Sequence, residues 1–304
     1  MERDFRPDVV FTVFGPAYVR FETTHVCGFA DPWVTHLSRV AIQALPWRPR
    51  QWTRVITARK KLFLSPEDYY CVEAPVAQRG LQRILGIPAG RIRVIPNSFS
   101  DVFEQAEQPG ARWPGEKDVI RLFTLANPYP HKNLVIIPPM ITELRRLDPR
   151  REYRFIVTVP EGSDEAHRFW SVADRYETRT RIENAGKLLL QDCPAWYAKS
   201  DIVFMPTLLE TFSATYPEAM KMKRPIVTTD LDFAHDICGD AALYYTPLSA
   251  EHAARQIQRL VADRELYEEL VRRGQARVGS FPSPEEKYRM QIAWLEEVAA
   301  RGRG

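Results

Sequence analysis

The chain has 304 residues, and 45% of them are hydrophobic, which excludes a wholly disordered protein and is enough for one or two domains with buried cores. Its 42 basic and 39 acidic residues leave a net charge of +3, which gives no reason to expect a nucleic-acid-binding protein. Cys27, Cys71, Cys193 and Cys238 form no C-x-x-C pair, which predicts reduced structural cysteines rather than metal ligands. No signal peptide begins at Met1, and no apolar run approaches the roughly 20 residues that span a bilayer, so we expect a cytoplasmic protein.

Short apolar runs predict four strands in the first hundred residues, over 9–14, 25–29, 69–72 and 92–95. A helix is expected over 75–85, where Gly86 ends it. Residues 98–115 are polar and rich in Gly, Pro and Glu, and we interpret them as an interdomain linker.

Residues 32–66 contain no acidic residue but hold seven basic ones, Arg39, Arg48, Arg50, Arg54, Arg59, Lys60 and Lys61. Trp33, Trp47 and Trp52 lie among them in a stretch that is predicted to be helical and broken near Pro46 and Pro49. Three interpretations are open: a solvated helix face, a nucleic-acid patch, or contact of residues 39–61 with a membrane surface. The chain has no recognisable nucleic-acid-binding motif, so we expect no nucleic-acid partner.

The second part of the chain alternates strands with helices. Strands are predicted over 119–125, 153–159, 202–205, 226–228 and 242–245, and helices over 133–147, 165–176 and 194–199. This alternation predicts a parallel, doubly wound α/β sheet. Further helices follow residue 249, and the last is amphipathic over 284–299.

Residues 201–228 predict a strand, a loop with Glu210, a helix with Glu218, and a further strand. Ser213 or Thr215 is expected to cap the helix, because hydroxyl side chains accept bonds from its first amide groups. Parallel sheets of this kind bind ligands at the carboxyl ends of their strands, and helix starts attract phosphate. The pattern therefore predicts an anion-binding edge flanked by two carboxylates.

The two glutamates are separated by seven residues and followed by Ala219-Met220 and the strand Pro225-Ile226-Val227. This pattern resembles the E-x7-E signature of retaining glycosyltransferases of family 4, also called glycosyl transferases group 1. The resemblance implies a GT-B fold, in which two Rossmann-like domains with parallel sheets face each other across a cleft.

The resemblance also implies a domain division. We expect an abbreviated N-terminal, acceptor-side domain with its linker over 1–110, and a C-terminal nucleotide-sugar-binding domain over 111–283. A final helix over 284–304 would return to the N-terminal domain. The resemblance is good from about Tyr69 onward and thin before it.

A second landmark, residues 125–134, closes one predicted strand and opens a helix with the string Pro-His-Lys-Asn-Leu. It resembles the phosphate-binding stretch of a bacterial subgroup of the family that builds surface polysaccharides. Lys132 occupies the family's lysine position, where an ammonium can neutralise a diphosphate leaving group without a metal. Asn127 stands where the family has arginine. The alternative interpretation of Lys132 is a solvated loop lysine.

The resemblance assigns catalytic roles to Glu210 and Lys132: Glu210 would contact the transferred sugar and balance charge at its anomeric carbon. Glu218 would accept hydrogen bonds from the ribose hydroxyls. Further donor-binding candidates are Thr211, Phe212, Ser213, Ala214, Thr215 and Asn127. Both glutamates could instead be surface residues. Asp31 and His25 are acceptor-side candidates, although Asp31 suits a turn and His25 a structural role.

The predicted function is transfer of a hexose from a UDP- or GDP-linked sugar to a glycan or lipid-linked acceptor, with no metal and no cofactor. The enzyme could be peripheral on the inner membrane. Two alternatives are open. A nucleotide-sugar epimerase of the same fold would need no acceptor, and a non-catalytic relative would only bind the sugar nucleotide.

Overall fold

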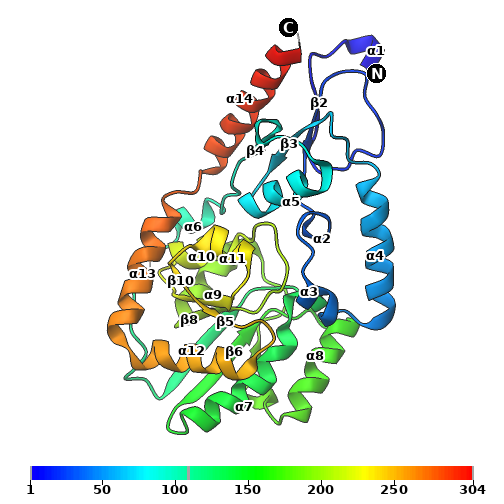
Figure 1. Ribbon diagram of the computed structural model, residues 1–304. Coiled ribbons are helices and arrows are strands. Elements are labelled where there is room, and N and C mark those ends of the chain that lie inside the picture. Colours follow the sequence, from blue (N-terminus) through cyan, green and yellow to red (C-terminus); the bar gives the residue numbers. More distant parts are fainter. Residues whose placement is uncertain (1, 108–109, 303–304) are drawn as a thin grey trace. The chain divides into compact units, whose positions relative to one another are not determined.

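The computed structural model describes residues 2–107 and 110–302, which form two compact units (Figure 1). Unit 1 takes in Met1–Ser98, Leu209–Ser213 and Phe281–Gly304. Unit 2 takes in Phe99–Leu208 and Ala214–Ser280. Each unit is built around a parallel sheet of its own, one of four strands and one of six.

The sheet of unit 1 has the strand order β1-β2-β3-β4, and every neighbouring pair is parallel. Its strands are β1 (Val10–Thr12), β2 (His25–Gly28), β3 (Tyr69–Val72) and β4 (Ile92–Val94). The helices of this unit are α1 (Glu2–Phe5), α2 (Pro32–Thr35), α3 (Arg39–Ala44), α4 (Trp47–Lys61), α5 (Pro75–Leu85) and α14 (Pro284–Gly302), with a 3₁₀ turn at Ala89–Arg91.

Successive side chains of β2 and β3 point to opposite faces of this sheet, so both faces need cover. One face packs against α2 and α5 in a core that includes Cys27, Val34, Tyr70, Val72, Ala77 and Leu81. The other face packs against α14 in a core of Val26, Cys71, Ile95, Trp294 and Val298. All four residues of β2 are buried because helices cover both faces.

The sheet of unit 2 has the order β10-β9-β8-β5-β6-β7 and is also parallel throughout. Its strands are β5 (Val119–Thr124), β6 (Glu152–Val157), β7 (Ile182–Asn184), β8 (Ile202–Met205), β9 (Ile226–Thr229) and β10 (Ala242–Tyr245). The chain builds outward from β5 to β7 and then crosses to β8 on the other side of β5. This reversal creates a switch point between β5 and β8, where sheets of this type bind ligands.

Helices cover both faces of the six-stranded sheet. They are α6 (Val102–Gln105), α7 (Ile137–Leu147), α8 (Asp164–Arg175), α9 (Cys193–Lys199), α10 (Thr215–Lys221), α11 (Asp232–Cys238), α12 (Ala250–Ala262) and α13 (Arg264–Val278). Short 3₁₀ turns lie at Pro130–Lys132, Leu134–Ile136, Arg179–Arg181 and Leu190–Asp192. The main core joins α7, α8 and α12 to one face, while Tyr197 of α9 packs edge-on against Phe123 of β5 on the other.

The expected α/β fold with parallel sheets is confirmed, and the predicted strands lie within two residues of their observed ends. The strand β7 and the helix α11 were not predicted. The helix expected over 133–147 begins only at Ile137, because Asn133 has the left-handed conformation with φ 53° and breaks the turn. The stretch interpreted as a linker contains α6, whose Phe103 is buried.

Gly80 in α5 controls how closely this helix approaches α2 in unit 1. A Cβ atom at this position would overlap the carbonyl group of Thr35, the last residue of α2. Arg83, one turn further along α5, donates a hydrogen bond of 3.2 Å to the same carbonyl oxygen. The absence of a side chain at Gly80 therefore lets α2 lie directly against α5.

We expect Gly80→Ala to lower the free energy of unfolding by about 1–3 kcal/mol, because the backbone of Thr35 must move to admit the methyl group. The measurement is urea unfolding followed by circular dichroism. Gly90→Ala is the matched control, since nothing lies within 4 Å of a Cβ added there. Equal unfolding midpoints for the two variants would show that the close approach of the helices does not matter.

Candidate functional site

The loops of the two stretches that the sequence analysis singled out, residues 125–134 and 201–228, meet at the switch point of unit 2. The loop after β5 and the loop after β8 are joined at the carbonyl oxygen of His131, which accepts a hydrogen bond of 2.7 Å from the amide of Leu208. The hydroxyl of Thr207 donates to the same oxygen at 3.4 Å. The strands are neighbours, and the hydroxyl of Thr124 on β5 also donates to the Phe204 carbonyl of β8 at 2.8 Å. The Lys132 loop is therefore fixed beside the chain that leads to Glu210.

Lys132 lies in a 3₁₀ turn rather than at the start of a helix. Pro130 begins this turn, and Asn133 ends it in the left-handed conformation, so α7 starts five residues after Lys132. The Lys132 side chain is half-buried, and burial lowers its pKa to about 8. Burial and the adjacent charge of Lys132 also lower the pKa of His131 to about 4. Burial therefore disfavours the protonated form of the Lys132 side chain.

The loop before this turn presents polar and aromatic side chains at the same edge. Asn127 is exposed on the segment that follows β5. The backbone beside it is held by the hydroxyl of Thr158 on the adjoining strand segment, which accepts from the Ala126 amide at 3.1 Å. Tyr129 is exposed and stacks on the His131 ring at 5.8 Å between centroids. These side chains form one margin of the switch point.

Glu218 in α10 is 6% exposed, which is unusual for a carboxylate. The hydroxyl of Tyr197 donates a hydrogen bond of 2.8 Å to one oxygen of Glu218. Tyr197 is itself fully buried and also hydrogen-bonds the side chain of Thr215. Burial raises the pKa of Glu218 to about 7, although the bond from Tyr197 opposes this shift. Burial therefore favours the protonated form of this carboxyl group far more than water does.

The start of α10 differs from the prediction. Its N-cap is Ala214, with helical dihedral angles and no side-chain hydrogen bond, so neither Ser213 nor Thr215 caps the helix. Ser213 and Ala214 are half-buried, and Thr215 is buried as the first helical residue. The hydroxyl of Thr215 is instead directed at Tyr197.

The segment Leu209–Ser213 belongs to unit 1. The ring of His36 contacts the backbone carbonyl of Glu210, with 2.6 Å between Nε2 and the oxygen, and its Nδ1 lies 2.7 Å from the Thr35 hydroxyl. The buried hydroxyl of Thr211 donates to the carbonyl of Ala30 at 3.1 Å. Phe212 packs edge-on against Phe281 at 5.5 Å. These contacts hold the backbone of the segment and leave the Glu210 side chain half-exposed.

The two acceptor-side candidates of the sequence do not lie together. Asp31 follows β2 at its carboxyl end, where its side chain accepts from the Trp33 amide at 3.0 Å and caps α2. Its other oxygen pairs with Lys60 at 2.5 Å. His25 begins β2 at the opposite edge of the sheet, so the two side chains cannot act on one group. Asp31 thus has a helix-capping and ion-pairing role in this structure.

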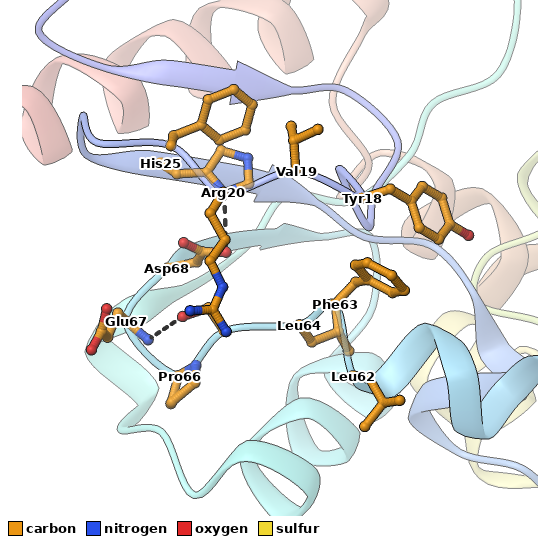
Figure 2. A pocket seen from close by; sticks show the side chains of 12 residues that line it. Tyr18, Val19, Arg20, His25, Leu62, Phe63, Leu64, Pro66, Glu67 and Asp68 are labelled. Atoms are coloured by element: carbon orange, nitrogen blue, oxygen red, sulfur yellow. Dashed lines mark hydrogen bonds and ion pairs between the residues drawn. The ribbon is translucent and has the colours of Figure 1, made fainter.

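His25 is buried, and both of its ring nitrogens have partners. Its Nδ1 pairs with Asp68 at 3.0 Å, and its Nε2 lies 2.8 Å from the Thr12 hydroxyl. His25 also lines a cavity of about 410 Å³ between the segments 18–21 and 62–68 (Figure 2). Figure 2 shows the Arg20 side chain extending across the cavity between these two segments.

Sequence reasoning missed two residues that bear on the site, His36 and Tyr197. Both act through contacts with residues far along the chain, so no local pattern marks them. The four cysteines are free, in line with the expected reduced state, and all four are buried. Over residues 2–107 and 110–302, no three His, Cys, Asp or Glu side chains are grouped as metal ligands would be. Within the same residues no helix is long and apolar enough to cross a bilayer.

Comparison with known proteins agrees with the geometry. Residues 121–263 match the family model described as "Glycosyl transferases group 1", which includes the whole of the switch point. None of the curated proteins matches the sequence at a significant level.

Solved structures share the fold. Sucrose-phosphate synthase from Thermosynechococcus elongatus superposes with a TM-score of 0.73 at 19% identity, over 92% of this chain and 69% of the other. HepE from Anabaena, in complex with UDP and glucose, superposes with a TM-score of 0.66 at 17% identity, over 90% of this chain and 71% of the other. WaaG, a glycosyltransferase involved in lipopolysaccharide biosynthesis, superposes with a TM-score of 0.68 at 14% identity, over 88% of this chain and 76% of the other. These likenesses show an α/β fold of the GT-B type.

We expect the raised pKa of Glu218 to make stability depend on pH. The folded chain keeps the Glu218 proton up to about pH 7, whereas the unfolded chain releases it near the model value of 4.5. The stabilising contribution is therefore complete below pH 4.5 and is lost as the pH rises through 7. Glu218→Gln cannot ionise and still accepts a bond from Tyr197, so this variant should match the wild type at pH 4.5 and exceed it by about 1–3 kcal/mol at pH 8.

Urea unfolding at both pH values measures this difference. Glu183→Gln, at an exposed position of β7, is the matched control and should follow the wild type at each pH. If Glu218→Gln also follows the wild type at pH 8, Glu218 is ionised in the folded protein without cost, and the assigned environment is wrong.

Proposed function

We propose that the chain is a retaining glycosyltransferase that moves a hexose from a nucleoside diphosphate sugar to a glycan or lipid-linked acceptor. The observation that carries this proposal is the union of the Lys132 loop with the β8 loop through His131, inside the segment that matches the family model. The complex of HepE with UDP and glucose supports a UDP-linked donor, and the role of WaaG in lipopolysaccharide biosynthesis supports a role in surface polysaccharide assembly.

Lys132 is proposed to bind the diphosphate of the donor. Its ammonium lies at the switch point, where the negative charge of a diphosphate would favour the protonated form that burial disfavours. One lysine can supply the positive charge that stabilises the leaving group, so the proposed reaction needs no metal. Asn127 and Ser213 would provide further hydrogen bonds to the donor, whereas the hydroxyls of Thr211 and Thr215 already bond Ala30 and Tyr197.

Glu218 is proposed to accept a ribose hydroxyl with the oxygen that Tyr197 does not bind. The bond from Tyr197 fixes the orientation of the carboxyl group, which makes the second oxygen a positioned acceptor. Protonation of Glu218 would not prevent this contact, because a neutral carboxyl group can still accept a hydrogen bond.

Glu210 is proposed to face the transferred sugar. It lies two residues after Leu208, and two residues span at most about 7 Å, so the chain itself keeps Glu210 near the edge of β8. His36 holds the backbone carbonyl of Glu210 and so limits where the carboxylate can reach. A carboxylate there would balance the positive charge that develops on the anomeric carbon.

The proposed reaction changes two bonds at that carbon. The bond from the anomeric carbon to the diphosphate oxygen breaks, and the electron pair leaves with the diphosphate. The acceptor hydroxyl oxygen forms the new bond on the same face of the sugar. The acceptor proton passes to the departing phosphate oxygen, so no protein base is required. Lys132 stabilises the charge that the diphosphate gains.

We expect the affinity for UDP to fall as the pH rises from 7 to 9.5. Lys132 is cationic below its pKa of about 8 and loses its charge above it, whereas the phosphates of UDP stay ionised throughout. Isothermal titration calorimetry across this range measures the effect. Lys132→Arg keeps the charge and should bind UDP with little change across the same range. If the affinity of the wild type for UDP does not vary with pH, Lys132 does not bind the diphosphate.

We expect Glu210→Ala to lower turnover on the order of 10²-fold or more with no change in fold, because one positioned charge is lost at the reacting carbon. Initial rates with matched donor and acceptor measure this, and Glu183→Ala serves as the control. NMR of the first product should show the anomeric configuration of the donor. Wild-type turnover in Glu210→Ala would contradict the role of this residue.

The same assay separates the proposal from its two rivals. Conversion of a nucleotide sugar to its epimer without acceptor would replace the transferase with an epimerase. Donor binding without transfer to any glycan or lipid-linked acceptor would replace it with a non-catalytic binding protein.

A further inference from the structure

The helix α4 in unit 1 exposes large apolar side chains, whereas most surface helices turn such side chains toward the core. Of its fifteen residues only Thr57 is buried. Trp47 is 70% exposed, Trp52 is 66% exposed and Val55 is 59% exposed. A contiguous patch of exposed apolar side chains marks an interaction surface.

The exposed residues of α4 are ordered on the helix. Trp47, Gln51, Val55, Ala58 and Leu62 follow one another at spacings of four, four, three and four, which places them on one face. This face is largely apolar. Exposed basic residues flank it on both sides, Arg48 and Arg59 on one and Arg54 and Lys61 on the other. The helix therefore presents an apolar stripe between two basic margins.

The apolar stripe continues beyond the end of α4. Leu62, which caps the helix, is 80% exposed, and Phe63 follows it. The ring of Phe63 meets the ring of Tyr18 edge-on at 5.0 Å, and the neighbouring Val19 is also exposed. Figure 2 shows Tyr18 and Phe63 facing each other, and Val19 and Leu62 line the same cavity. Two segments far apart in sequence thus build one exposed apolar tip.

The charge of this region differs from that of the rest of the chain. Residues 32–66 hold seven basic and no acidic residues, which leaves 35 basic against 39 acidic residues elsewhere. Lys60 is neutralised by Asp31, but the basic residues on the margins of the stripe point outward and are exposed. A net positive face on an otherwise slightly acidic chain favours an anionic partner.

We propose that this surface binds the headgroup layer of an anionic phospholipid bilayer. The name α4 surface is used for the exposed face of α4 together with the tip formed by Tyr18, Val19, Leu62 and Phe63. Tryptophan and tyrosine suit the membrane interface, aliphatic side chains enter the acyl boundary, and each Arg or Lys gains from anionic headgroups. Nucleic acid fits less well, because the aliphatic members of the stripe offer bases no stacking partner.

This inference does not depend on the proposed reaction. A lipid-linked acceptor would be held in the same bilayer, but vesicle binding can be measured without donor, acceptor or turnover. Failure of the transferase assay would leave the membrane proposal standing, and failure of vesicle binding would leave the transferase proposal standing.

The first experiment is co-sedimentation of the whole chain with vesicles of phosphatidylcholine containing about one third phosphatidylglycerol. We expect most of the protein to sediment with these vesicles and little with pure phosphatidylcholine. Raising the salt concentration to 0.5 M should release a large part of it, because salt screens the contacts with the headgroups. Binding to a DNA or RNA duplex without binding to vesicles would overturn the proposal.

Two double variants test the two parts of the α4 surface. Leu62→Glu with Phe63→Glu should weaken binding to the anionic vesicles at least about tenfold, because the tip loses its apolar character. Leu189→Glu with Leu190→Glu is the matched control, since it alters an exposed apolar pair in unit 2. Arg54→Glu with Lys61→Glu should also weaken binding at least about tenfold, against Arg255→Glu with Arg264→Glu on exposed helix faces of unit 2.

Thermal unfolding of each variant checks that the fold survives. If the Leu62/Phe63 pair fails to fold, the Arg54/Lys61 pair still tests the proposal, because these side chains are exposed. Equal sedimentation of the α4 variants and their controls would overturn the proposal. The proposal would also be overturned if the wild type sedimented equally with vesicles that contain phosphatidylglycerol and with vesicles that lack it.

Discussion

The hydrogen bond from the Leu208 amide to the His131 carbonyl is the constraint on which the candidate site depends. It joins the loops of two adjacent parallel strands at the point where the order of the sheet reverses. Lys132 follows the acceptor by one residue, and Glu210 follows the donor by two. A single backbone contact therefore fixes the chain segments that lead to both candidate residues.

Burial adjusts the charges at this site in a way that suits an anionic ligand. It lowers the pKa of Lys132 and raises that of Glu218, so it disfavours the charged form of both side chains. The proposed diphosphate would favour the charged form of Lys132 by Coulomb attraction, while Tyr197 keeps Glu218 in place. These shifts support the proposed binding of a ligand that carries negative charge.

Sequence patterns were sufficient for the parts of the fold that depend on local periodicity. The apolar runs at β5, β8 and β9 gave their strands, and the spacing of Glu210 and Glu218 indicated the loop and helix between them. The left-handed Asn133 and the cap at Ala214 were not predictable, because tertiary packing decides both. The partnerships of Tyr197 with Glu218 and of His36 with Glu210 connect residues too distant in sequence for any local pattern to show.

The most direct test of the account is a crystal structure of the protein with a bound nucleoside diphosphate sugar. We predict that the diphosphate lies at the edge of β5 and β8, with an oxygen within about 3 Å of Lys132 Nζ, and that the ribose contacts Glu218. A diphosphate bound elsewhere in the molecule, or one at this edge without contact to Lys132, would contradict the account.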